Sequence, residues 1–182
     1  MKQLVQMKKT SEANEVEVNG KTENSPVFKK IDHIAIAVAD LDSSINFFVD
    51  ILGFSLIRRR CITGQRTGMI SAGIEHNGIK FVLCQGTEAE SQVSKLIESF
   101  GPGVAHIALE VDDVSSAANS LRIQGLHFDT TVISGPGLKQ IFSTRDKNSG
   151  MSFEFIERNG EEGFLQDNVK ELFAQLEKSG SF

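Results

Sequence analysis

The 182-residue sequence contains no tryptophan and no tyrosine, so its 13 phenylalanines supply all of its large aromatic side chains. A pocket in this chain can therefore offer stacking surface but no phenolic hydroxyl or indole N–H. Only two cysteines are present, Cys61 and Cys84, which is too few for the disulfide framework of a small secreted domain. We interpret them as free thiols of a protein in the reducing cytoplasm.

Long hydrophobic runs and an excess of basic residues are also missing. No apolar segment approaches the roughly 20 residues that cross a bilayer, and the N-terminus lacks the apolar core of a signal peptide. The 19 Lys and Arg are scattered along the chain and are outnumbered by 24 Asp and Glu, which gives a net charge of −5. This composition excludes the basic footprint of a nucleic-acid-binding surface. We therefore expect a cytoplasmic protein that binds a small-molecule substrate, with neither a membrane nor a nucleic acid as its partner.

Residues 1–28 differ in composition from the rest of the chain. They are rich in Lys, Glu, Asn and Thr, without a sustained hydrophobic period, and are typical of a disordered leader. The remaining residues, 29–182, are enough for one domain with a sizeable core.

This domain contains an internal repeat. Placing His33 over His106, an offset of 73 residues, aligns HIAIAVADLDSSINFF with HIALEVDDVSSAANSL. The identical pairs are His33/His106, Ile34/Ile107, Ala35/Ala108, Val38/Val111, Asp40/Asp113, Ser43/Ser116 and Asn46/Asn119. A match at a fixed offset indicates a duplicated structural unit. We assign repeat one to residues 30–86 and repeat two to residues 103–158.

Each repeat predicts the same order of elements. A strand (31–38 or 104–111) leads to an Asp that can cap the following helix (41–51 or 114–124). Three further strands follow in each repeat, at 55–61, 68–73 and 79–84 in the first and at 130–133, 138–143 and 152–156 in the second. A linking segment at 88–100 and a C-terminal helix at 167–178 complete the expected α+β fold. In this fold two βαβββ units form a half-open β-barrel around a metal site.

Three side chains are candidate metal ligands. His33 and His106 occupy equivalent positions on equivalent strands, so a pseudo-twofold arrangement directs both into one cavity. Glu154 stands between two phenylalanines in the last strand, where a buried carboxylate is costly unless a cation or a charged partner compensates it. The equivalent residue of repeat one is Val82, which cannot coordinate a metal.

Two histidines and one carboxylate, with further positions open, form the facial triad of non-haem Fe(II) oxygenases. The same ligand set also suits a catalytic Zn²⁺, and a closed structural metal site is the remaining alternative. We therefore expect His33, His106 and Glu154 to be both the metal ligands and the catalytic residues.

The duplicated unit with these ligands resembles the vicinal oxygen chelate superfamily, which contains glyoxalases, epimerases, bleomycin resistance proteins and dioxygenases. The segments FGPGVAHIALEVDDV, LKQIFSTRD, FEFIERNG and GFLQDNVKELF are similar to the C-terminal, metal-binding half of the 4-hydroxyphenylpyruvate dioxygenase family. In that family the two histidines and the glutamate bind Fe(II). The resemblance further implies five substrate-binding residues, which are Gln92, Gln140, Phe142, Phe164 and Asn168.

The activity implied by this resemblance is an Fe(II)-dependent dioxygenase reaction of an α-keto acid with O₂. A metal-dependent isomerase, epimerase or lyase, with Zn, Ni, Co or Mn in place of iron, is the alternative, and a binding protein is a third interpretation. The family enzyme carries a further N-terminal domain, so we also expect this chain to pair as a homodimer.

Overall fold

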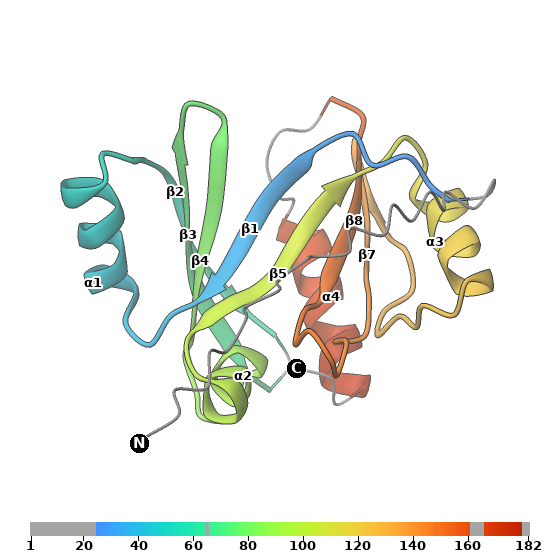
Figure 1. Ribbon diagram of the computed structural model, residues 1–182. Coiled ribbons are helices and arrows are strands. Elements are labelled where there is room, and N and C mark those ends of the chain that lie inside the picture. Colours follow the sequence, from blue (N-terminus) through green and yellow to red (C-terminus); the bar gives the residue numbers. More distant parts are fainter. Residues whose placement is uncertain (1–24, 65, 161–165, 180–182) are drawn as a thin grey trace, which may run out of the picture.

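The computed structural model describes residues 25–64, 66–160 and 166–179, which form one curved eight-stranded sheet with helices on both of its faces (Figure 1). The expected leader lies mostly outside these residues. The strands are β1 (Ile31–Ala37), β2 (Ser55–Thr63), β3 (Gly68–His76), β4 (Ile79–Gly86), β5 (Gly103–Glu110), β6 (Ile133–Gly135), β7 (Leu138–Phe142) and β8 (Phe153–Arg158). The helices are α1 (Leu41–Asn46), the π-helical turn η1 (Phe47–Ile51), α2 (Gln92–Phe100), α3 (Val114–Ile123) and α4 (Gln166–Ser179).

The strand order, β2-β3-β4-β1-β5-β8-β7-β6, confirms the two βαβββ units. Each unit pairs its first strand in parallel with its last, β1 with β4 and β5 with β8. The two units then join through the antiparallel pair β1–β5, which lies at the centre of the sheet (Figure 1). The pseudo-twofold relationship that the sequence repeat predicts is therefore present in the hydrogen bonding of the sheet.

The helices of the two repeats begin at equivalent caps. The Asp40 carboxylate accepts a hydrogen bond from the backbone N–H of Ser43 at 2.7 Å, and Asp113 accepts one from Ser116 at 2.8 Å. Beyond the first of these helices the chain turns at Gly53, whose φ of +77° is a conformation that glycine adopts without strain. The predicted single helix over 41–51 is divided in the structure into α1 and η1.

Helices α1 and α3 cover one face of the sheet, each with its own apolar core. Leu41 and Ile45 of α1 pack against Ala72, Ile74 and Leu83. The equivalent cluster packs Val114, Ala117 and Ala118 of α3 against Ile141 and Phe155. Because strand residues alternate between faces, the neighbours of these core residues point to the opposite, concave face.

Helix α4 packs on the concave face. Its Val169 and Phe173 form an apolar cluster with Ile62 of β2, and Met69 packs against that cluster. The side-chain carbonyl of Gln175 accepts a hydrogen bond from the backbone N–H of Thr131 at 2.8 Å. This helix therefore contacts both repeats and covers part of the space between them.

One predicted strand is misplaced. We expected a strand at 130–133, but β6 begins at Ile133. The Thr130 hydroxyl instead accepts a hydrogen bond from the backbone N–H of Phe142 at 3.0 Å. This segment is therefore held by a side chain rather than by the backbone hydrogen bonds of a β-ladder.

Two other features of the described chain bear on earlier expectations. Cys61 and Cys84 are both free, the first exposed and the second buried. Within the described residues, none of the helices combines the length and the apolar character that a membrane crossing requires.

Candidate metal centre

The register of the central strands brings the two candidate histidines together. On the antiparallel pair β1–β5, Ala35 lies opposite His106 and His33 lies opposite Ala108. The histidines are thus diagonal neighbours on one face, and their ring centroids are 5.6 Å apart. The symmetric exchange of His and Ala across this pair is a direct consequence of the repeat.

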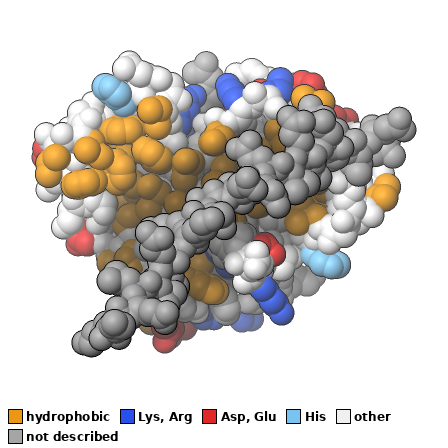
Figure 2. Space-filling model, in the orientation of Figure 1, with side chains coloured by type: hydrophobic (Ala, Val, Ile, Leu, Met, Phe, Trp, Pro, Cys, Tyr) orange, Lys and Arg blue, Asp and Glu red, His pale blue; other side chains and the backbone are white. Residues whose placement is uncertain are grey.

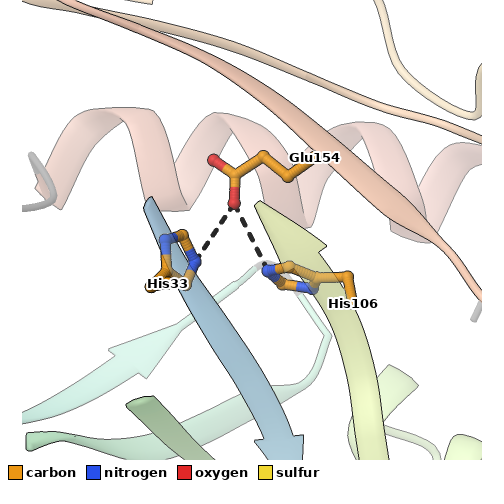
Figure 3. Close-up of side chains that lie close together, drawn as sticks. All are labelled: His33, His106 and Glu154. Carbon is orange, nitrogen blue, oxygen red and sulfur yellow. Dashed lines mark ion pairs between the residues drawn. The ribbon is translucent and has the colours of Figure 1, made fainter. Parts of the chain in front are cut away.

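Glu154 joins the histidines from the next strand. In the parallel pair β5–β8 it is the register partner of Ala108, which places it beside His106 on the concave face. Its Oε2 atom lies 3.2 Å from Nε2 of His33 and 3.3 Å from Nε2 of His106. Figure 3 shows the three side chains converging from β1, β5 and β8.

The Glu154 carboxylate is fully buried and lacks ordinary hydrogen bonds. Among the described residues, neither of its oxygens has a hydrogen-bond partner of good geometry, and its nearest charge-compensating groups are the two imidazoles. Burial favours the neutral acid, but His33 and His106 together lower the pKa of Glu154 to about 2. The site therefore concentrates negative charge in a place that a cation would occupy favourably.

The two imidazoles differ in their electrostatic surroundings. Burial would lower the pKa of His33, but the carboxylates of Glu154 and Asp32 raise it to about 9. Burial lowers the pKa of His106, and Glu154 opposes this shift only in part. The His33 ring is therefore the one held between two acidic groups.

Behind His33 stands a second carboxylate that the sequence analysis overlooked. A register shift interrupts β1 between Ile31 and His33, and Oδ1 of Asp32 lies 2.8 Å from Nδ1 of His33. Arg158 of β8 holds this carboxylate in turn, donating from Nε at 2.5 Å and from Nη2 at 2.8 Å. A carboxylate on the distal nitrogen is the usual support of a metal-binding histidine, because it fixes the tautomer and the ring orientation.

The donor set fits a divalent metal ion. One ligand atom each from His33, His106 and Glu154 can be chosen so that all lie within 4.8 Å of one another. Two imidazoles and a carboxylate suit Fe(II), Zn²⁺ and related ions alike. Val82, the register partner of Ala35 on β4, occupies the position equivalent to Glu154 and presents only a hydrocarbon to the same space.

A cavity of about 70 Å³ opens beside these candidate ligands. Gln140 and Phe142 of β7, both predicted from the sequence, line it together with the three candidate ligands. Gln140 is 1% exposed, and its side-chain carbonyl oxygen has no hydrogen-bond partner among the described residues. An unpaired polar atom at this position is available to a bound molecule.

The other predicted substrate residues are not brought to this cavity. Gln92 begins α2 and is absent from the cavity lining, although its side-chain oxygen is buried without a partner. Asn168 is also absent from that lining, and its side-chain amide donates to the Leu138 carbonyl at 3.3 Å, a contact that attaches α4 to β7. Phe164 lies outside the described residues.

Several residues at the site were not predicted from the sequence. Val169 and Leu172 of α4 line the cavity, as does Arg60 of β2. The sequence shows the apolar stripe of α4, but it does not show which part of the sheet this stripe packs against. The available signal for Asp32 was a charged residue next to a candidate ligand in an otherwise apolar strand.

Comparison with known proteins places this geometry in context. The family model of the Glyoxalase/Bleomycin resistance protein/Dioxygenase superfamily matches residues 30–155. A 4-hydroxyphenylpyruvate dioxygenase from Legionella pneumophila (strain Corby) is 28% identical, over 81% of this chain and 53% of its own length. The chain thus spans about half the length of this curated relative.

Two solved structures extend the comparison to the fold. A mutant of 4-hydroxymandelate synthase from Streptomyces coelicolor superposes with a TM-score of 0.74 and 23% identity, covering 90% of this chain and 57% of that one. Methylmalonyl-CoA epimerase from Mycobacterium tuberculosis superposes with a TM-score of 0.63 and 25% identity, covering 76% of this chain and 93% of that one. The fold is therefore shared by a protein named as a synthase and by one named as an epimerase.

Proposed function

Because the chain belongs to the glyoxalase/bleomycin resistance protein/dioxygenase superfamily, we propose that it is a non-haem Fe(II)-dependent dioxygenase acting on an α-keto acid or a related small substrate. His33, His106 and Glu154 are the proposed iron ligands and catalytic residues. Iron in such a site supplies Lewis acidity toward the keto acid and one-electron chemistry with O₂.

Three residues can act as ligands, whereas the position in repeat one that is equivalent to Glu154 holds an apolar residue. This combination is the observation that carries the proposal. Val82 stands where the pseudo-symmetry would place a fourth ligand, so that side of the site is left to substrate and O₂. The position is the one where a metal-dependent isomerase would gain a further ligand or a carboxylate base, and a hydrocarbon supplies neither.

In the proposed reaction the two atoms of O₂ have separate fates. One atom joins the keto carbon as CO₂ leaves, which converts the keto acid to a carboxylate. The other atom is transferred to the remainder of the substrate. This stoichiometry needs no further reductant, because decarboxylation supplies two of the four electrons and the oxygenated substrate supplies the other two.

The chain's own residues position the substrate and exclude water. The unpaired side-chain oxygen of Gln140 suits a hydrogen bond from the substrate, and Phe142 packs edge-on against His106 at 5.3 Å between ring centroids. Val169 and Leu172 add apolar surface from α4. Such a lining favours an apolar part of the substrate next to the ligands and limits the access of water. For Gln92, Phe164 and Asn168, a substrate contact remains a prediction.

A divalent-metal isomerase, epimerase or lyase is the second candidate function. The match to the M. tuberculosis epimerase favours this candidate. Our chain covers 93% of that epimerase chain, so the match needs no second domain. In this case the metal would be Zn, Ni, Co or Mn, and the reaction would consume no O₂.

Metal content and O₂ uptake separate the two candidates. The protein would be purified anaerobically, loaded with Fe(II), and offered 4-hydroxyphenylpyruvate and a panel of aryl and alkyl α-keto acids. The dioxygenase predicts about one iron per chain and keto-acid-dependent O₂ uptake. Uptake should disappear in His106→Ala and persist in His127→Ala, an exposed histidine outside the cluster. Stoichiometric metal with no O₂ uptake would favour the second candidate.

We further propose a cytoplasmic homodimer. The two free thiols fit a reducing compartment. Figure 2 shows hydrophobic side chains gathered on the side of the molecule that carries α1. Phe47 and Ile51 of η1, which follows α1 in the chain, and Leu52 at its C-terminal end are exposed large hydrophobic residues. Exposed apolar surface of this kind is typical of an interface. Sedimentation equilibrium would give twice the monomer mass, and a monomer at micromolar concentration would refute the pairing.

A further inference from the structure

A second and larger cavity adjoins the candidate metal centre. Its volume is about 240 Å³, against about 70 Å³ for the cavity at the ligands. The two cavities share part of their walls, formed by His33, Arg60, Ser71 and Val82. A molecule that contacts the ligands and outgrows the smaller cavity would therefore extend into the larger one.

The larger cavity is unusually cationic for a protein with a net charge of −5. Its lining contains the basic residues Arg58, Arg60, Lys80 and Arg158 and the acidic residues Asp32 and Glu75. Arg158 and Asp32 bind one another, and the other charged residues named in this lining are Arg58, Arg60, Lys80 and Glu75, with Glu75 directly opposite Lys80 in the β3–β4 pair. Among the described residues, neither Arg58 nor Lys80 forms an ion pair.

Strand geometry explains this concentration of charge. Arg58 and Arg60 are two residues apart on β2 and line the same cavity, whereas Arg59 forms an ion pair at 2.6 Å with Asp42 of α1, on the opposite face. Gly73 is the register partner of Arg58 and also lines the cavity. A methyl group at Gly73 would meet nothing within 4 Å, so this glycine leaves open space in front of the arginine.

We propose that this cavity, which includes Arg58, Arg60 and Lys80, binds a second anionic group, a carboxylate or a phosphate, at the far end of the substrate. The inference rests on the proposed function, because it places the other end of the substrate at His33, His106 and Glu154. The substrate class is then an α-keto acid with two anionic ends. Guanidinium groups suit this role because they bind carboxylate and phosphate with paired, charge-assisted hydrogen bonds.

The test compares ligands that differ only in the distal charge. A series of α-keto dicarboxylic acids from oxaloacetate to 2-oxopimelate would be titrated by calorimetry into the protein loaded with Co²⁺. Each acid would be paired with the unbranched monocarboxylic 2-oxo acid of the same chain length, and a phosphonate-terminated analogue would separate phosphate from carboxylate recognition. At the best length we expect the dianion to bind about tenfold more tightly or better, as for a hydrogen bond to a charged group.

Matched variants locate the effect. Arg58→Gln and Lys80→Gln should each reduce the preference for the dianion while binding the monocarboxylic acid with unchanged affinity, because both residues line only the larger cavity. Arg59→Gln removes the same charge from the same strand on the opposite face, and should keep the preference. Equal binding of the two ligand classes in the native protein, or a preference that survives in Arg58→Gln and Lys80→Gln, would overturn the inference.

The test of the anionic subsite and the test of the dioxygenase activity can fail independently of one another. Stoichiometric metal and keto-acid-dependent O₂ uptake without a preference for dianions would uphold the dioxygenase and refute the anionic subsite. A preference for dianions without O₂ uptake would do the reverse. The same ligand comparison can be made in the metal-free protein, with binding measured from NMR chemical-shift changes. It tests the anionic subsite even if the purified protein retains no metal.

Discussion

Oδ1 of Asp32 lies 2.8 Å from Nδ1 of His33, the ring nitrogen that faces away from Glu154. His33 therefore joins two carboxylates, one in the ligand cluster and one outside it. Asp32 in turn is bound by Arg158, whose strand also carries Glu154. Burial opposes ionisation of Asp32, but the hydrogen bonds from Arg158 and His33 keep its pKa below the ordinary value, so it remains a carboxylate. The orientation of His33 is thus fixed before any metal binds.

This relationship predicts that Asp32→Asn weakens metal binding without unfolding the protein. An asparagine loses the charge that supports the imidazole and presents an amide to Arg158, so we expect the dissociation constant for Co²⁺ to rise about 10- to 100-fold. Isothermal titration calorimetry would measure it. Asp42→Asn, which removes an exposed carboxylate on the other face, serves as the control. Equal affinities in the two variants would mean that Asp32 does not support the ligand.

The packing of α4 predicts a large stability effect at Phe173. This side chain is 3% exposed and packs with Ile62 and Val169, joining the helix to β2. Phe173→Ala should lower the free energy of unfolding by about 3 kcal/mol, through lost burial and the cavity left behind. Urea denaturation would measure the loss, with Lys170→Ala, exposed on the same helix, expected within about 0.5 kcal/mol of the native protein. A loss below about 1 kcal/mol at Phe173 would show that α4 is not packed on the sheet in solution.

The two thiols should react at very different rates. Cys61 is exposed, whereas Cys84 is buried at the metal-site cavity, and burial raises the pKa of the Cys84 thiol to about 12. At pH 8 a disulfide reagent should therefore modify one thiol per folded chain and the second only in denaturant. Cys61→Ser should remove the fast phase. Fast labelling of that variant would contradict the burial of Cys84.

The same group gives a pH dependence of stability. The pKa of Cys84 is raised on folding, so its contribution is complete below the ordinary value of 9.0 and declines as pH rises through about 12. The difference in stability between the native protein and Cys84→Ala should accordingly shrink over that window, as measured by urea denaturation at a series of pH values. A constant difference from pH 8 to 11 would contradict the raised pKa.

The fold and the clustering of the candidate ligands were predictable because the repeat carries geometric information. Once His33 is aligned with His106, antiparallel pairing of the first strands places each histidine opposite the alanine that follows the other by two residues. The alternation of buried and exposed residues then places Glu154 on the same face. These conclusions need only the period of the strands and the symmetry of the duplication.

Other parts of the site depend on contacts that cannot be predicted from the periodic spacing of apolar residues in the sequence. Asp32 reaches His33 because of a register shift within β1, and the sequence gives no sign of that irregularity. Arg60 and Arg59 are neighbours of the same type, and only the tertiary structure decides which of them faces the cavity. The division of the first helix at Phe47 likewise reflects local packing of η1, which the apolar spacing of residues 41–51 does not distinguish from a continuous α-helix.

The apolar residue at the fourth pseudo-symmetric position gives the sharpest prediction about the chemistry. Val82 pairs with Ala35 as Glu154 pairs with Ala108, so Val82→Glu would present a second carboxylate to the same space. We expect divalent metal to bind more tightly, on the order of tenfold for one added charged ligand, and keto-acid-dependent O₂ uptake to fall to background because the open positions are reduced. Calorimetry with Co²⁺ and an oxygen electrode with the Fe(II) protein would measure the two effects.

Val82→Leu is the matched control, since it keeps a hydrocarbon at the position and should retain O₂ uptake within a few-fold. The informative result is the contrast between the two variants. If Val82→Glu kept full uptake with one iron per chain, substrate and O₂ would have to approach from another side, and the dioxygenase proposal would lose its main structural support. If it instead lost uptake and gained the ability to exchange the α-proton of a keto acid or thioester, the same residue would separate the oxidative and isomerising branches of this fold.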